Sequence, residues 1–348
     1  MDIEAVAAEV LREHGVPAAE IETAWVIDGE VEAQANPSNP RAAQQEANPE
    51  PCEAPFELPE AEMLSPQARQ HFGLARHPFV DDVQGPQDVY LSREQRYIRE
   101  SMYYAAKHAG FVAVVGESGS GKTTLRRDLI DRIRRDNEPI LVIQPQTIDK
   151  KVLTAAHICD AVIADLSNER PRLSLEAKSR QVQRLLAGSA RGGNAHVLII
   201  EEAHDLAVRT LKYLKRFWEL EDGFKKLMGV VLIGQPELGD LLDERRNHDA
   251  LREVIRRCEV AHLRPLNGGL EEYLALKFRR VGADPKDIFE GRDIYDAMRN
   301  RLTRHRVGTN EVESQVYPLS VQNLVVKCMN AAVELGLPKI NAQLIGRV

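Results

Sequence analysis

The sequence predicts an α/β fold built on a parallel sheet flanked by helices, and two patterns support this. Short apolar runs alternate with stretches of helical periodicity between residues 92 and 263, as strands and helices do in parallel sheets. The run at 111–115 is apolar throughout and lies between glycines, which is typical of a strand buried on both faces. With 348 residues, 43% of them hydrophobic, the chain is long enough for about two domains.

The elements expected in the body of the chain follow from periodicity. Strands are expected at 111–115, 140–144, 196–200, 230–234 and 260–263. Helices are expected at 65–74, 92–108, 123–136, 150–165, 174–190, around 211–218, and again after 234. From 268 onward the pattern is helical only, so we expect an α/β core over 66–267 and a small all-α part over 268–348.

The first 65 residues differ from the rest in charge. They hold 15 Asp and Glu against 2 Lys and Arg, whereas the remainder holds 38 against 44. Helical spacing over 3–25 predicts a small acidic helical appendage at 1–33, and the proline-rich, acidic stretch 34–65 predicts a flexible linker. The mildly basic body is compatible with nucleic-acid binding.

Several classes of protein are excluded at this stage. No run reaches the roughly 18 apolar residues of a membrane-spanning helix, and the acidic start is unlike a secretory signal, so a cytoplasmic location is expected. The four cysteines form no CxxC pair, which argues against a zinc site or a redox motif: Cys52, Cys159, Cys258 and Cys328.

The strongest motif is a phosphate-binding loop between the first strand and its helix. It fits G-x-x-x-x-G-K-[ST] and reads Gly116-Glu117-Ser118-Gly119-Ser120-Gly121-Lys122-Thr123, with Thr124 following. The glycines let main-chain N–H groups surround a phosphate at a helix N-terminus. Lys122 can reach the β- and γ-phosphates, and the Thr123 hydroxyl can bind Mg²⁺. The alternative is a glycine-rich turn that matches by chance, but its place in the chain favours a nucleoside triphosphate site.

Polar residues follow two further apolar runs. Glu201 and Glu202 come after 197–200, at the strand end where α/β sheets bind ligands. We expect Glu201 on the metal side and Glu202 as general base, the alternative being a solvated acidic turn. Gln235 follows 230–234 and would face the γ-phosphate or the attacking water, unless it only caps a loop.

Taken together, five segments resemble AAA+ ATPases, and more narrowly the ExeA-type group with the transposition target-selection ATPases (Mu B-like, TniB-like and TnsC-like). The segments are HFGLARHPF, GESGSGKTTL, VLIIEEAH, VVLIGQPEL and LREVIRRCEVAHLRPL, within residues 65–270. The resemblance implies an ATPase core, a helical lid and an ATP site at the interface of a homo-oligomer.

The resemblance also assigns residues. Gln235 stands at the sensor position, and Arg257 at the arginine finger that reaches a neighbour's γ-phosphate, with Arg256 as the alternative. Phe79, with His77 and Pro78, falls where relatives contact adenine. Leu319 stands where relatives often carry a lid arginine, which implies weaker coupling of lid closure to hydrolysis or a slow ATPase.

Two uses of the ATPase fit the resemblance. The architecture favours assembly with ATP on double-stranded DNA and regulation of a transposase, because secretion-type relatives usually add a membrane segment and a wall-binding domain. The alternatives are an ExeA-type secretion-associated ATPase, or a nucleotide-dependent switch with little hydrolysis. The DNA contacts expected, unless these residues are only an exposed basic face, are Lys150, Lys151, Lys212, Lys215 and Arg216. Phe217 and Trp218 are expected in the core.

Overall fold

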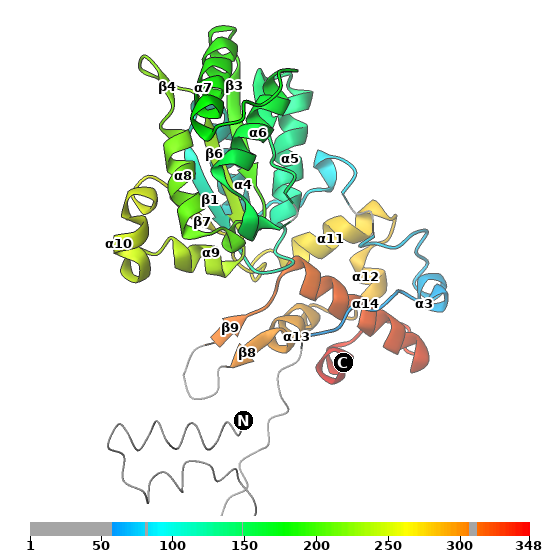
Figure 1. Cartoon of the computed structure of the whole chain (residues 1–348). Helices are drawn as coiled ribbons and strands as arrows, with labels where there is room; N and C mark the ends of the chain where they lie inside the picture. The colour runs from blue at the N-terminus through cyan, green and yellow to red at the C-terminus, as the bar shows by residue number, and fades with distance from the viewer. Residues whose placement is uncertain (1–57, 81–82, 148, 306–311) are drawn as a thin grey trace, which may run out of the picture. The chain divides into compact units, whose positions relative to one another are not determined.

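The computed structural model describes residues 58–80, 83–147, 149–305 and 312–348 (Figure 1). The chain divides into two units, 1–55 and 56–348, and the described residues all belong to the second. The predicted appendage at 1–33 and most of the predicted linker at 34–65 lie outside the described residues.

A five-stranded, fully parallel sheet forms the centre of the second unit. Its order is β2-β3-β6-β1-β7, so β6 is central and β1 lies between β6 and β7. Val115 at the end of β1 pairs with Gly234 at the end of β6. The strands are β1 (Phe111–Val115), β2 (Ile140–Ile143), β3 (Ala195–Ile200), β6 (Gly229–Gly234) and β7 (Glu259–His262). All five strands were expected, and the predicted fold class is confirmed.

Helices cover both faces of the sheet (Figure 1). In β1, Phe111, Ala113 and Val115 face one apolar cluster, whereas Val112 and Val114 face the other. This alternation explains why the strand is apolar throughout. The first cluster is covered by α6 (Ala155–Leu166), α7 (Leu175–Arg191), α8 (Val208–Trp218), α9 (Pro236–Leu241) and α10 (Glu244–Ile255). The second is covered by α4 (Arg93–His108) and α5 (Lys122–Arg135).

The C-terminal part, which we call the lid, has its own apolar core. Its helices are α11 (Leu270–Arg280), α12 (Pro285–Ile288), α13 (Asp293–Arg301), α14 (Pro318–Glu334) and α15 (Ala342–Arg347). The expectation of a purely helical lid is wrong, because β8 (Thr303–His305) pairs antiparallel with β9 (Val312–Ser314). These strands are short and mostly polar, so they carry no apolar alternation.

The segment before α4 also departs from the expected division. Helix α3 (Pro66–His71) and the residues after it bury Ala68, Phe72, Leu74 and Phe79 in the apolar core of the lid rather than in that of the sheet. Just before α3, the main chain of Pro59 and Met63 accepts hydrogen bonds from Asn323 and Asn330 of α14. The last residues of the predicted linker are therefore hydrogen-bonded to the lid.

Smaller elements complete the unit. They are the 3-10 helices η1 (Pro86–Asp88), η2 (Lys150–Val152) and η3 (Ala203–Asp205), and a hairpin of β4 (Glu221–Asp222) and β5 (Lys225–Lys226). Within the described ranges, every helix is too short or too polar to span a lipid bilayer.

Candidate functional site

The loop between β1 and α5 has the backbone geometry that a phosphate cradle requires. Gly119 and Gly121 adopt φ of +74° and +99°, a region that residues with a Cβ rarely enter. A Cβ on Gly116 would come within 2.7 Å of Ser120 Oγ. The Gly116 N–H donates to the Gly234 carbonyl at 3.2 Å, which fixes the start of the loop against the end of β6. The glycines of the motif are thus required by conformation and by space.

Lys122, the first residue of α5, is held inside this loop. Its Nζ donates to the carbonyls of Gly116 and Glu117 at 2.7 and 2.8 Å. Burial lowers the pKa of the ammonium group, while the carboxylates of Glu202, Glu117 and Glu237 act in the opposite direction. The lysine therefore stands beside the cradle as a buried cation that can exchange carbonyl partners for a phosphate.

Ser120 supplies a test of whether this loop fits a bound anion. Its side chain is 2% exposed, and its Oγ has no hydrogen-bond partner among the described residues. Buried polar atoms without partners are uncommon in folded proteins and call for a ligand or water. Ser120 lines the same cavity as Lys122 and Thr123, so the residues present fit a phosphate group.

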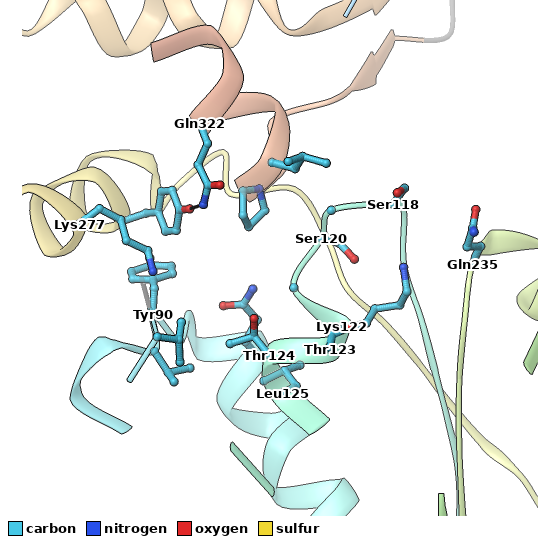
Figure 2. A pocket seen from close by; sticks show the side chains of 18 of the residues that line it. Tyr90, Ser118, Ser120, Lys122, Thr123, Thr124, Leu125, Gln235, Lys277 and Gln322 are labelled. Carbon is cyan, nitrogen blue, oxygen red and sulfur yellow. Dashed lines mark hydrogen bonds between the residues drawn. The ribbon is translucent and has the colours of Figure 1, made fainter. Parts of the chain in front are cut away.

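A cavity of about 360 Å³ lies along the loop. Figure 2 shows Lys122 and Gln235 toward one end of it, and Tyr90, Lys277 and Gln322 at the other. The loop contributes 118–125, the ends of β3 and β6 contribute Glu202 and Gln235, and the lid contributes side chains from α11 and α14. Of the predicted residues, the structure brings together 118–124, Glu202 and Gln235 at this cavity, whereas Gly116 and Glu117 do not line it.

The two acidic residues after β3 point to different partners. Glu202 lines the cavity, in a left-handed conformation with φ of +52°. Glu201 does not line it; its Oε2 lies 2.9 Å from Nε of Arg126 on α5. Thr123, the other expected metal ligand, does line the cavity. Of the two expected metal ligands, Thr123 thus lies at the phosphate site, whereas Glu201 is paired with Arg126.

His204, which sequence reasoning left without a role, connects two of these groups. Its Nδ1 accepts a hydrogen bond from the Gln235 N–H at 3.4 Å and lies 3.5 Å from Glu202 Oε2. The motif EEAH contains this histidine, but its contacts with Glu202 and Gln235 arise only because the ends of β3 and β6 lie close together. His204 therefore links the segment that carries Glu202 to the segment that carries Gln235.

The structure places Phe79, the residue expected to contact adenine, in the apolar core of the lid. Phe79 does not line the cavity; its ring packs edge-on against Phe278 in the lid, with centroids 5.8 Å apart. His77, whose pKa is lowered by burial, accepts a hydrogen bond from the Phe79 N–H at 3.1 Å.

Residues that sequence reasoning missed form the far end of the cavity. Tyr90 packs edge-on against Tyr273 at 5.6 Å, and Gln322 Nε2 donates to Tyr273 Oη at 2.6 Å. The three side chains come from before α4, from α11 and from α14. No local motif marks them, because they meet only in the tertiary structure.

The two candidate finger arginines lie outside this cavity. Arg257 Nη1 is 3.4 Å from Glu219 Oε1, and Arg256 Nη2 is 3.3 Å from Glu244 Oε1. Both side chains are substantially exposed. Within one chain neither reaches the phosphate loop, so the finger role stays a prediction about a neighbouring subunit.

Some of the candidate DNA-contacting side chains are paired with groups of the same chain, and others are exposed to solvent. Lys150 donates to the carbonyls of Pro145 and Thr147, and Lys215 lies 2.8 Å from both Glu219 and Glu253. Lys151 lies 3.9 Å from Asp205 but remains mostly exposed. Lys212 and Arg216 are exposed on α8. Phe217 is buried and Trp218 packs against the core, as expected.

Comparison with known proteins gives a consistent picture. Residues 105–242 match the model of the AAA domain family. A 216-residue stretch, 61% of the chain, is 30% identical to General secretion pathway protein A of Aeromonas hydrophila. It covers 38% of that protein, so the chain spans about two fifths of the length of its curated relative.

The fold resembles that of a solved structure. The Drosophila origin recognition complex bound to DNA gives a TM-score of 0.51 at 12% identity, covering 97% of this chain and 72% of that one. Cdc6p of Pyrobaculum aerophilum gives 0.46 at 15% identity, covering 78% and 68%. Residues 105–242 thus resemble an AAA domain, and the fold is the AAA+ α/β fold.

Proposed function

We propose that this protein binds Mg-ATP in the cavity along residues 118–125 and hydrolyses it. The observation that carries the proposal is the convergence of Lys122, the unpartnered Ser120 hydroxyl, Glu202 and Gln235 on one cavity. A binding module would need only the first two groups. A carboxylate and an amide from two adjacent strand ends are what activation of a water molecule requires.

Each residue has a separate task in the proposed reaction. Lys122 leaves the carbonyls of Gly116 and Glu117 and turns to the phosphates, and the Ser120 hydroxyl acquires the partner that it lacks. The Thr123 hydroxyl holds Mg²⁺, which when bound neutralises phosphate charge. The Glu202 carboxylate takes a proton from the water that attacks the γ-phosphorus, and the Gln235 amide orients that water.

Titration calorimetry with Mg-ATP tests the binding half of this proposal. Lys122→Ala should weaken binding by at least about ten-fold, because charge-assisted hydrogen bonds contribute about 1.5–3 kcal/mol each. Lys107→Ala is the matched control, since Lys107 on α4 pairs with Glu138 away from the cavity. Absence of binding heat in the folded wild type, or equal binding by Lys122→Ala, would refute the proposal.

We further propose that the active form is a homo-oligomer. Arg257 and its alternative Arg256 are exposed and lie outside the cavity of their own chain, which is what a residue acting on a neighbour's ATP requires. Light scattering with and without a slowly hydrolysed ATP analogue tests this. A monomer under both conditions would contradict it.

For the cellular role, the comparisons favour a secretion-associated ATPase over a transposition regulator. The curated relative is a general secretion pathway protein, and transposase regulation rests on the sequence resemblance alone. We therefore place the secretion-associated use first. Co-purification with envelope proteins supports it, whereas ATP-dependent recruitment of a transposase would reverse the order.

One observation favours DNA as a second candidate partner. On α8, Arg209, Lys212 and Arg216 lie at helical spacing around Tyr213; Arg209 donates to the Tyr213 hydroxyl at 2.8 Å, and Arg216 lies 5.6 Å from its ring centroid. Cations with an aromatic group suit a phosphate backbone.

Fluorescence anisotropy with duplex DNA at two salt concentrations tests this second candidate. Lys212→Glu with Arg216→Glu should abolish salt-sensitive binding, and Lys339→Glu on the lid is the control for a charge reversal on another surface. Equal binding by the double variant would exclude this face.

A further inference from the structure

An ion pair joins the helix that follows the phosphate-binding loop to the end of β3. Arg126 is the fifth residue of α5, one turn after Lys122, and Glu201 directly follows β3. Nε of Arg126 lies 2.9 Å from Oε2 of Glu201, and the two side chains are 18% and 30% exposed. Because both are largely shielded from water, their attraction is screened less than that of a surface pair. The pair therefore holds Glu201 against α5.

Each of these two charges compensates the other. Among the residues that the structure describes, the pair is the only ion pair of either side chain, and Nε of Arg126 is buried without a well-aligned hydrogen bond. A guanidinium group stays charged in proteins, so it needs a nearby carboxylate when it is shielded from water. Moving Glu201 away would leave Arg126 without that compensation. The structure thus favours keeping the carboxylate of Glu201 at Arg126.

The ion pair lies beside the nucleotide cavity but does not line it. Thr123 and Glu202 line the cavity, whereas Arg126 and Glu201 do not. Mg²⁺ binds carboxylate oxygens and keeps several water molecules, so a carboxylate at a strand end can assist only if it faces the ion. The charge of Glu201 is instead compensated by a guanidinium, and that cation also repels Mg²⁺. Both effects weaken the metal side of the site.

We propose that Arg126 withholds Glu201 from Mg²⁺ and thereby reduces the contribution of the metal to nucleotide affinity. This proposal rests on the proposed binding of Mg-ATP. In the wild type the Thr123 hydroxyl is available to the ion, while Glu201 stays with Arg126. Without the guanidinium, the carboxylate of Glu201 becomes available to the ion as well. Arg126 is therefore a positioning residue, because it lies outside the cavity and acts on the metal through Glu201.

Titration calorimetry with a slowly hydrolysed ATP analogue, in Mg²⁺ and in EDTA, measures this contribution without any turnover. In the wild type, Mg²⁺ should strengthen binding by at most about three-fold, since only a hydroxyl of the protein reaches the ion. In Arg126→Gln the strengthening should be about ten-fold greater than in the wild type, because no charge-assisted contact has to be broken to free Glu201. The double variant Arg126→Gln with Glu201→Gln should return to the wild-type ratio, because no carboxylate is left to free.

Two further variants separate this effect from a general loss of charge or of fold. Arg126→Lys keeps a cation at the position and should keep the wild-type ratio. Arg127→Gln removes the same charge from the next, exposed residue of α5 and should also leave the ratio unchanged. An unchanged ratio in Arg126→Gln, or a wild-type ratio that Glu201→Gln alone lowers by about ten-fold, would overturn the proposal. A wild type that does not bind the analogue in either buffer would instead refute the proposed function.

Discussion

Replacing Glu202 by Gln should abolish ATP hydrolysis while leaving ATP binding intact. Glu202 lines the cavity with its side chain 55% exposed, and Gln keeps its size and its left-handed backbone. Folding should therefore be unaffected. Loss of a general base typically slows a reaction by about 10²–10⁴-fold, which corresponds to roughly 3–5 kcal/mol on the barrier. Binding should stay equal or tighten, since a negative charge near the triphosphate is removed.

The measurement is phosphate release at saturating Mg-ATP, with affinity determined separately by calorimetry. Glu237→Gln is the matched control, because the Glu237 carboxylate also acts on Lys122 but lies outside the residues that line the cavity. Its kcat should stay within about two-fold of the wild type. The assignment of Glu202 would be refuted if Glu202→Gln kept more than about a tenth of wild-type kcat, or if Glu237→Gln lost as much.

Three other predictions follow from the same structure. Arg257→Ala should lower the kcat of the assembled protein by about 10³-fold without changing ATP affinity. Arg256→Ala should leave kcat unchanged. The reverse result in the phosphate-release assay would assign the arginine finger to Arg256. His196 is buried, and burial lowers its pKa below the ordinary 6.5. The unfolded chain therefore binds a proton at His196 more readily than the folded protein does. The free energy of unfolding should fall as the pH drops from 6.5 through the folded pKa, by up to about 1.4 kcal/mol per pH unit. Denaturant unfolding should show a weaker acid dependence in His196→Asn, and an equal dependence would exclude His196 as its source. Phe79→Leu should lower the free energy of unfolding by about 1 kcal/mol and leave ATP affinity unchanged. Tyr90→Ala should lower ATP affinity. If calorimetry showed weaker ATP binding by Phe79→Leu and unchanged binding by Tyr90→Ala, the placement of these two residues relative to the site would be refuted.

The core of the fold was accessible from the sequence because its strands are buried on both faces. Runs such as 111–115 are apolar throughout and cannot be mistaken for solvent-exposed segments. Their order in the sheet was not accessible, since pairing partners are set by long-range packing. The hairpin of β4 and β5 was missed although Asp222-Gly223 is a known turn signal, because its strands have only two residues each. The lid hairpin was missed because its strands are mostly polar.

The acidic pair after β3 shows that a sequence motif alone does not determine which side chains reach the site. Both carboxylates follow a buried strand, and the sequence alone gave each a role in the site. The side chain of Glu201 instead meets Arg126, one turn into α5 from the phosphate-binding loop. That pairing depends on how β3 and α5 lie side by side, and no spacing in the sequence encodes it. The role of Glu202 stays a prediction, but its position at the cavity is what the role requires.

The two ends of the cavity differ in how they are encoded, and this difference bears on specificity. The phosphate end is built from consecutive residues whose main-chain groups and one lysine do the binding, so a short motif is enough to find it. The opposite end is built by Tyr90, Tyr273 and Gln322, which lie far apart in the sequence and meet through ring packing and one hydrogen bond. Two of these three belong to the lid. Discrimination between nucleotide bases should therefore depend on the position of the lid, whereas affinity for the triphosphate should depend mainly on the loop.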